Sequence, residues 1–87
     1  MIHIAFPMLV IRTEAAIRRA DAVLLELDAL AVDITHAEGQ APAGQDRASV
    51  YAAGSAVRFA AGGLRREIGS LREARGHLAA VNVEVAS

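Results

Sequence analysis

Aliphatic side chains recur at helical spacings in both halves of the chain. In the second half, valine or leucine returns at every seventh position from Val50 to Val85. In the first half, apolar residues from Ile17 to Ile34 alternate between spacings of three and four. Both spacings place side chains along one side of an α-helix, where helices pack against one another. The pattern therefore predicts an all-α fold, an antiparallel helical hairpin with two long helices.

One short loop is expected between the helices, because glycine, proline and polar residues gather there. Thr13 and Asp46 are suitable N-caps for the first and second helix. The chain, residues 1–87, is then a single helical domain. The expected segments are 1–12 extended, 13–37 with the first helix at about 14–36, 38–46 as the loop, and 47–82 with the second helix at about 47–81.

Residues 1–12 and the pair Gly62-Gly63 could each change where the helices begin or end. Residues 1–12 are expected to lie extended, as a short strand or a strap along the helices, because apolar residues alternate from Ile2 to Phe6 and Pro7 interrupts a helix. The pair Gly62-Gly63 lies inside the second helix. We favour a continuous helix, because the seven-residue repeat keeps its phase across the pair. The alternative is a three-helix bundle broken there.

The repeats predict the core between the two helices. Heptads counted from Val50 also place Glu67 within that core and Arg75 beside it. The predicted hairpin core consists of Ile17, Ala20, Leu24, Leu27, Ala31, Ile34, Val50, Val57, Leu64, Ile68, Leu71 and Leu78.

Two further surfaces remain once the core is assigned. The first helix has a second apolar line, which one partner helix cannot cover. The second helix has small residues at every seventh position, and such rows let another helix approach closely. We predict that both surfaces contact a further helix. The alternatives are scattered surface aliphatics on the first helix and an exposed or hinged glycine face on the second. The predicted interface comprises Ala22, Leu25, Ala29, Val32, Ser55, Gly62, Gly69 and Gly76.

Size and composition favour assembly. The chain has 87 residues, 3% aromatic residues and no cysteine. A domain this small buries a modest share of its surface, and no disulfide or thiolate metal site can stabilise it. Added stability then has to come from helix packing or from another chain. We expect a dimeric four-helix bundle, formed with a second copy or with a related helical protein.

Charge is divided between the two halves. The net charge of −1 gives no reason to expect a nucleic-acid partner. The first helix is rich in acids and the second in arginines, which favours their attachment to each other or to another chain. Arg58, Arg65 and Arg72 also repeat every seven residues. We interpret them as a solvated face; a phosphate- or RNA-binding row is the alternative, without interleaved aromatic residues for base stacking.

No recognisable catalytic motif is present. The sequence has no nucleophile–base pair, no glycine-rich phosphate loop after a strand and no carboxylate dyad, and its three histidines are not at metal-ligand spacings. We therefore expect a non-catalytic interaction protein without cofactor or metal. The alternatives are an accessory subunit of antitoxin or immunity type, and a small enzyme that holds an anionic substrate at a dimer interface through Arg58, Arg65 or Arg75.

Targeting features are also few. The apolar run Ile2–Ile11 is too short to span a bilayer as a helix. It has no basic region before it and no small-residue cleavage site after it, so we expect no secretory signal peptide. The sequence leaves two locations open, the cytoplasm or export without a cleaved signal peptide.

The order of segments resembles a known family. An apolar start, a helix opening at Ile11–Ala16, a glycine-rich turn and a longer alanine-rich helix are similar to the small helical-hairpin proteins of type VII (ESX) secretion, the Trp-x-Gly family and its relatives. Gly54–Phe59 resembles the segment after the family's Trp-x-Gly turn, and Leu64–Leu78 its second helix. Ala52 stands in place of the tryptophan, and the C-terminal tyrosine motif is absent. The resemblance implies a hairpin that dimerises with a like hairpin, often one encoded nearby.

Overall fold

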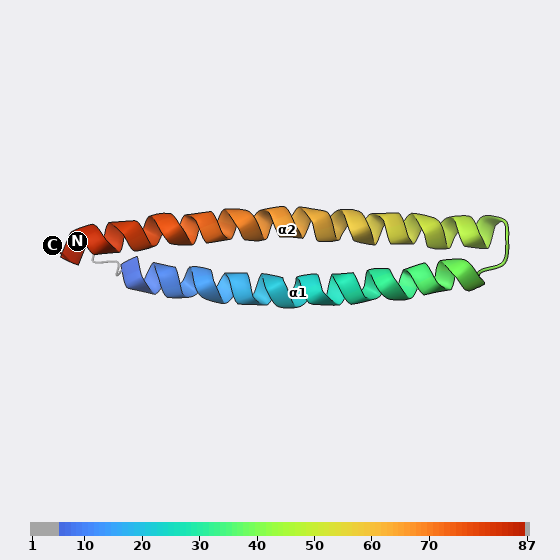
Figure 1. The fold of residues 1–87 in the computed structure, drawn as a ribbon, viewed down its shortest axis with the longest axis horizontal. Helices are drawn as coiled ribbons and strands as arrows, with labels where there is room; N and C mark the ends of the chain where they lie inside the picture. Colours follow the sequence, from blue (N-terminus) through green and yellow to red (C-terminus); the bar gives the residue numbers. More distant parts are fainter. Residues whose placement is uncertain (1–5, 87) are drawn as a thin grey trace.

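The protein is a two-helix hairpin. The computed structural model describes the backbone of residues 6–86 and the side chains of residues 6–81. Over this range the chain forms α1 (Phe6–Gln40) and α2 (Gln45–Ala86). The helices lie antiparallel and side by side along a rod with extents of 66 × 19 × 14 Å (Figure 1). The expected all-α helical hairpin is confirmed.

Helix α1 is longer than expected at both ends. It begins at Phe6, so residues 6–12, which we expected to be extended, are helical; residues 1–5 lie outside the described residues. Pro7 does not interrupt the helix, because the first turn of a helix has no partner for the N–H that proline lacks. Thr13 is not an N-cap but lies inside the helix, where its hydroxyl donates to the carbonyl oxygen of Leu9 at 2.8 Å.

The loop is correspondingly short and covers residues 41–44. Gly44 has a φ of 106°, a conformation that glycine adopts readily, and its carbonyl oxygen accepts from the N–H of Ala48 at 3.1 Å. The guanidinium group of Arg47 donates to the carbonyl oxygen of Ala41 at 2.8 and 3.2 Å, which ties the end of α1 to the start of α2. Asp46 lies in the first turn of α2, so Gly44 precedes that helix where we expected Asp46 to cap it.

Helix α2 is continuous through Gly62 and Gly63 and ends at Ala86, five residues beyond the expected range. The alternative three-helix bundle is therefore wrong. A helical glycine pair costs free energy, but the apolar row on either side of it packs on the same partner helix.

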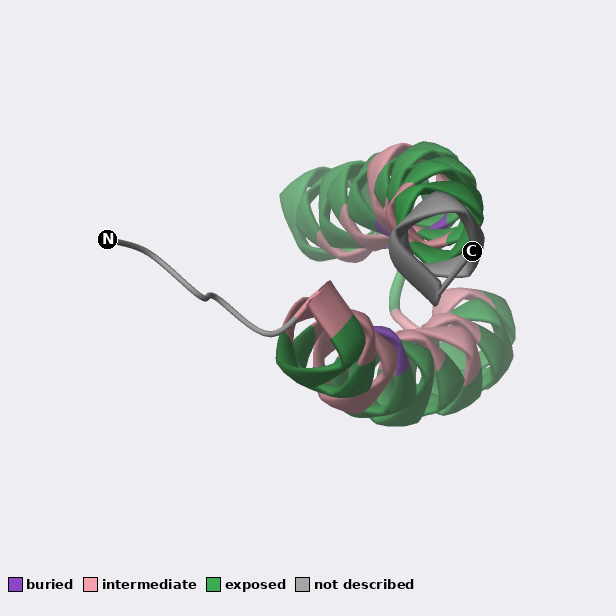
Figure 2. Ribbon diagram, turned by 90° about the vertical axis from the view of Figure 1, so that its left-hand side faces the viewer, coloured by how far each residue is buried: buried purple, intermediate pink, exposed green. Residues whose placement is uncertain are grey.

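The core is one thin seam between the helices. Ile17, Ala61 and Ile68 are the buried hydrophobic residues, with 6%, 3% and 3% of their surfaces exposed, and no described side chain is fully enclosed. Figure 2 shows exposed residues covering the sides that the two helices turn away from each other. The structure places every predicted core residue in a buried or half-buried position: Ile17, Ala20, Leu24, Leu27, Ala31, Ile34, Val50, Val57, Leu64, Ile68, Leu71 and Leu78.

The second apolar row of α2 lies one residue later than the heptad count indicated. Glu67, which we expected in the core, is exposed, and its neighbour Ile68 is buried. The row that faces α1 consists of Gly54, Ala61, Ile68 and Arg75. Three of these four residues are small or charged, so their contribution to the seam is not apparent from hydrophobicity.

Candidate interaction surface

Among the side chains that the structure describes, four ion pairs join α1 to α2, each between an acid of the first helix and an arginine of the second. Arg65 donates to both carboxylate oxygens of Asp28 at 2.8 Å. The other three pairs have nitrogen–oxygen distances of 3.6 to 4.0 Å, and they are Arg72–Asp21, Arg58–Glu38 and Arg75–Glu14. The charge division between the helices therefore serves their mutual attachment.

These pairs define the register of the hairpin more than they stabilise it. The side chains of Arg65 and Asp28 are 55% and 43% exposed, and exposed pairs contribute about 0.2–1 kcal/mol each. The pairs also engage Arg58, Arg65 and Arg75, the arginines considered for an anionic substrate. Such a substrate would have to displace a carboxylate, so the geometry does not favour that alternative.

Near the loop, a charged side chain occupies a core position. Glu38 is 18% exposed, and its Oε1 atom is buried without a hydrogen-bond partner, 3.7 Å from Arg58. Gly54 leaves the room for it: a Cβ atom on this glycine would lie 2.7 Å from the Glu38 Oε1 atom and 3.1 Å from the Ile34 Cγ2 atom. The glycine thus leaves space for the side chains of Glu38 and Ile34 at this end.

Helix α1 carries a second row of residues at alternating spacings of three and four, which we call the outer seam. It lies roughly 150° around the helix from the core seam, at about 100° per residue. Its four large apolar side chains are strongly exposed: Leu25 at 73%, Ile11 at 57%, Val32 at 56% and Met8 at 55%. The outer seam consists of Met8, Ile11, Ala15, Arg18, Ala22, Leu25, Ala29, Val32 and His36.

Charged rows separate the outer seam from the core on both sides. One is the acidic row Glu14, Asp21 and Asp28, whose carboxylates pair with arginines of α2. The other is a mixed row with two basic and two acidic residues, all exposed: Arg12, Arg19, Glu26 and Asp33. The four α1 residues of the predicted interface are exposed members of the outer seam: Ala22, Leu25, Ala29 and Val32.

The predicted interface residues of α2 form a different surface. Ser55, Gly69 and Gly76 are exposed, and Gly62 is half-buried. A Cβ atom built on Gly69 or Gly76 would meet no atom within 4 Å, and one on Gly62 would meet only the Arg66 side chain at 3.9 Å. The hairpin therefore does not bring this glycine row and the outer seam together.

Alanine substitutions distinguish Gly54, which lies against side chains of α1, from glycines such as Gly69, which do not. Gly69→Ala is expected to raise the free energy of unfolding by about 1 kcal/mol, because alanine favours the helix and fits without a clash. Gly54→Ala is expected to lack this gain, because its Cβ atom crowds Glu38 and Ile34. Chemical denaturation at equal protein concentration compares the two. Equal free energies of unfolding for the two variants would contradict the crowding at Gly54. Weaker self-association of the Gly69→Ala variant would indicate a helix packed on the glycine row.

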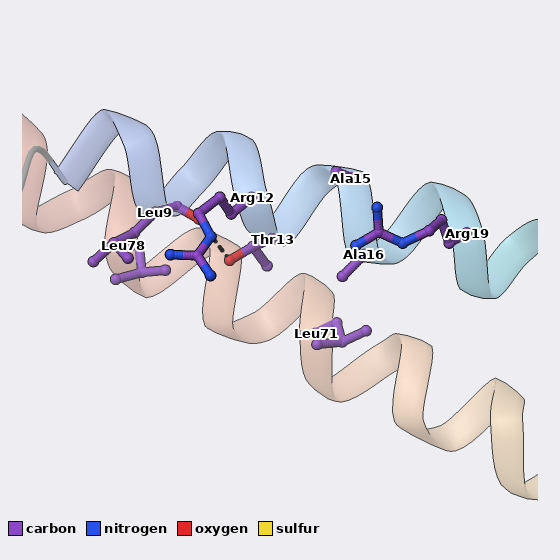
Figure 3. Close-up of a pocket in the computed structure, with 8 residues that line it drawn as sticks. All are labelled: Leu9, Arg12, Thr13, Ala15, Ala16, Arg19, Leu71 and Leu78. Carbon is purple, nitrogen blue, oxygen red and sulfur yellow. Dashed lines mark hydrogen bonds between the residues drawn. The ribbon is translucent and has the colours of Figure 1, made fainter.

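A shallow groove of about 620 Å³ lies between the start of α1 and the far end of α2 (Figure 3). Leu71 and Leu78 come from α2, and the guanidinium groups of Arg12 and Arg19 extend from α1. The Thr13 hydroxyl is bonded to its own helix. The groove is open to solvent and lacks the converging polar groups of a small-molecule site. Its lining comprises Leu9, Arg12, Thr13, Ala15, Ala16, Arg19, Leu71 and Leu78.

Among the described side chains of residues 6–81, no three or more histidine, cysteine or acidic residues are grouped so that they could hold a metal ion. Neither α1 nor α2, as far as they are described, is long and apolar enough to cross a membrane. Comparison of the chain with protein-family models, curated proteins and solved structures found no significant match.

Proposed function

We propose that this protein is a non-catalytic interaction protein whose hairpin pairs with another helical hairpin through the outer seam of α1. The observation that carries the proposal is the exposure of Leu25, Val32, Ile11 and Met8 along one line of a helix. Single exposed aliphatic residues are normal, but a mostly apolar row, interrupted here by Arg18 and bordered by charges, is typical of a protein–protein contact.

The thinness of the core supports the same function. A hairpin with three buried hydrophobic residues among those described has little apolar burial to offset the conformational entropy of ordering two long helices. A second hairpin packed on α1 would bury the outer seam and add the missing helix–helix contacts. Folding and association are then coupled, as they are in many small obligate dimers.

The resemblance to the hairpin proteins of type VII secretion extends the proposal to the class of partner. That resemblance implies a helical hairpin that pairs with a like hairpin, and the described part of this chain is a helical hairpin. We place the chain among proteins of that kind, as a homodimer or a heterodimer with a related chain encoded nearby.

The association state tests this function. Sedimentation of the purified chain over a wide range of concentrations is expected to show two-chain particles, either alone or after co-expression with the product of the adjacent gene. A chain that stays monomeric and fully helical in both settings would contradict the proposal. Stable capture by one larger protein, with no hairpin pair, would favour the accessory-subunit function instead.

A further inference from the structure

We infer that the occupant of the outer seam is a second copy of this chain, whose α1 lies antiparallel on the first. This inference rests on the proposed function and names the partner within it. The contact would be isologous, with the same residues contributed by both copies across a two-fold axis. Two features of α1 carry it: the order of charges beside the seam and the order of side-chain sizes within it.

The mixed charged row is self-complementary when it is reversed. It reads Arg12, Arg19, Glu26, Asp33, two positive residues followed by two negative ones. The midpoint of Arg19 and Glu26 and the midpoint of Arg12 and Asp33 coincide, just past Ala22. A two-fold axis through that point therefore brings each arginine beside an acid of the second copy, four opposite pairs in total.

A parallel arrangement of the same helices has the reverse effect. It would place the mixed row beside the acidic row of the second copy, so that Glu26 and Asp33 would lie near other acids and only Arg19 would face a carboxylate. None of the four residues forms an ion pair within the described part of the hairpin, where every ion pair uses other acids and arginines. Their charges are available to a partner, and their order selects the antiparallel direction.

Side-chain size within the outer seam follows the same direction. Between residues 11 and 32, one line of the seam contains Ala15, Ala22 and Ala29, and the other contains Ile11, Arg18, Leu25 and Val32. In an antiparallel pair of helices each line faces the other line of its partner, whereas in a parallel pair each line faces itself. The antiparallel pair thus sets small residues against large ones, which fills space evenly and lets the backbones approach.

The acidic row on the other side of the seam would otherwise oppose this contact. Two copies related by the axis bring Glu14, Asp21 and Asp28 near the same three residues of the second copy. Each of these carboxylates is paired within its own chain, with Arg75, Arg72 and Arg65 respectively. The ion pairs of the hairpin therefore neutralise the one border of the seam where like charges would gather.

Single charge reversals, measured alone and mixed, test the arrangement. Arg19→Glu and Glu26→Arg each place like charges together at two symmetric contacts. Each variant alone is therefore expected to self-associate about tenfold more weakly than the natural chain. An equimolar mixture restores opposite charges at both contacts, because position 19 of one variant meets position 26 of the other. The mixture is expected to form a heterodimer with near-natural affinity, measured by sedimentation velocity at low ionic strength.

Arg66→Glu is the matched control, since it makes the same charge change on an exposed part of α2. It is expected to leave self-association unchanged, and circular dichroism verifies that every variant is helical. A reversal that leaves self-association unchanged, or a mixture as weak as its components, would overturn the antiparallel contact. A natural chain that pairs only with a related hairpin would also overturn it, while supporting the proposed function. A chain that pairs with nothing would overturn both.

Discussion

Ile68→Ala is expected to remove most of the cooperative folding of this hairpin. Ile68 is 3% exposed and is one of two large residues, with Ile17, that the described seam buries. Truncating a buried isoleucine to alanine costs about 2–5 kcal/mol, which is comparable to the 3–5 kcal/mol that one small core supplies. Thermal unfolding followed by circular dichroism is expected to show a broad, low-temperature transition in place of a cooperative one.

Phe59→Ala is the matched control for this experiment. This substitution removes a larger side chain from the same helix, but Phe59 is 78% exposed. Its replacement is expected to leave the midpoint of unfolding nearly unchanged at the same protein concentration, since association would otherwise shift it. If the two variants lost stability equally, the seam through Ile68 would not be the core of the fold.

Leu25→Asp is expected to dissociate the pair without changing any residue of the hairpin core. Leu25 is 73% exposed in the single hairpin, so aspartate costs little there. Within a two-fold contact the change removes two buried leucines, each contributing about 1.5–3 kcal/mol, and puts two charges in their place. Self-association is expected to weaken by at least about 100-fold, as measured by sedimentation equilibrium.

Phe59→Asp provides the comparison, because it places the same charge on the most exposed of the large apolar residues, on α2. It is expected to leave association unchanged. A Leu25→Asp variant that associates as strongly as the natural chain would show that the outer seam is not the contact. Equal weakening by both substitutions would point to a contact that also includes the outward side of α2.

The hairpin itself could be predicted because its repeats are long and their phase is unbroken. The row through Leu64 and Leu71 stays on one side of α2 across Gly62 and Gly63, so the structure continues where local propensity alone would favour a break. The ends of the helices could not be predicted as well. A proline occurs both in the first turn of a helix and at helix breaks, and a threonine occurs both as an N-cap and inside a helix. The sequence does not distinguish these positions for Pro7 and Thr13.

The details of the seam were less accessible to sequence reasoning. The strict repeat of valine and leucine fixes one row of α2, but the neighbouring row is interrupted by Gly54, Ala61 and Arg75. Counting in heptads therefore placed Glu67 in the core next to Ile68, although only Ile68 is buried there. The spacing from Val57 through Ala61 to Leu64 would have indicated the correct row, because it alternates four and three as the first helix does.

The candidate interface was predicted on α1 as a second apolar line, and the exposure of Leu25 and Val32 is what that prediction requires of the unpaired hairpin. The contact itself stays a prediction. The mixed row beside it was not singled out from the sequence, because its four residues gain meaning only once the seam they border is known.

The scarcity of enclosed side chains has a consequence for the life of the protein in the cell. If the hairpin pairs as proposed, its few buried side chains give one copy little stability of its own, so newly made chains without their counterpart would spend a larger share of their time unfolded, where proteases act on them. Steady-state abundance would then follow the supply of the counterpart, and surplus chains would be removed without a dedicated regulator.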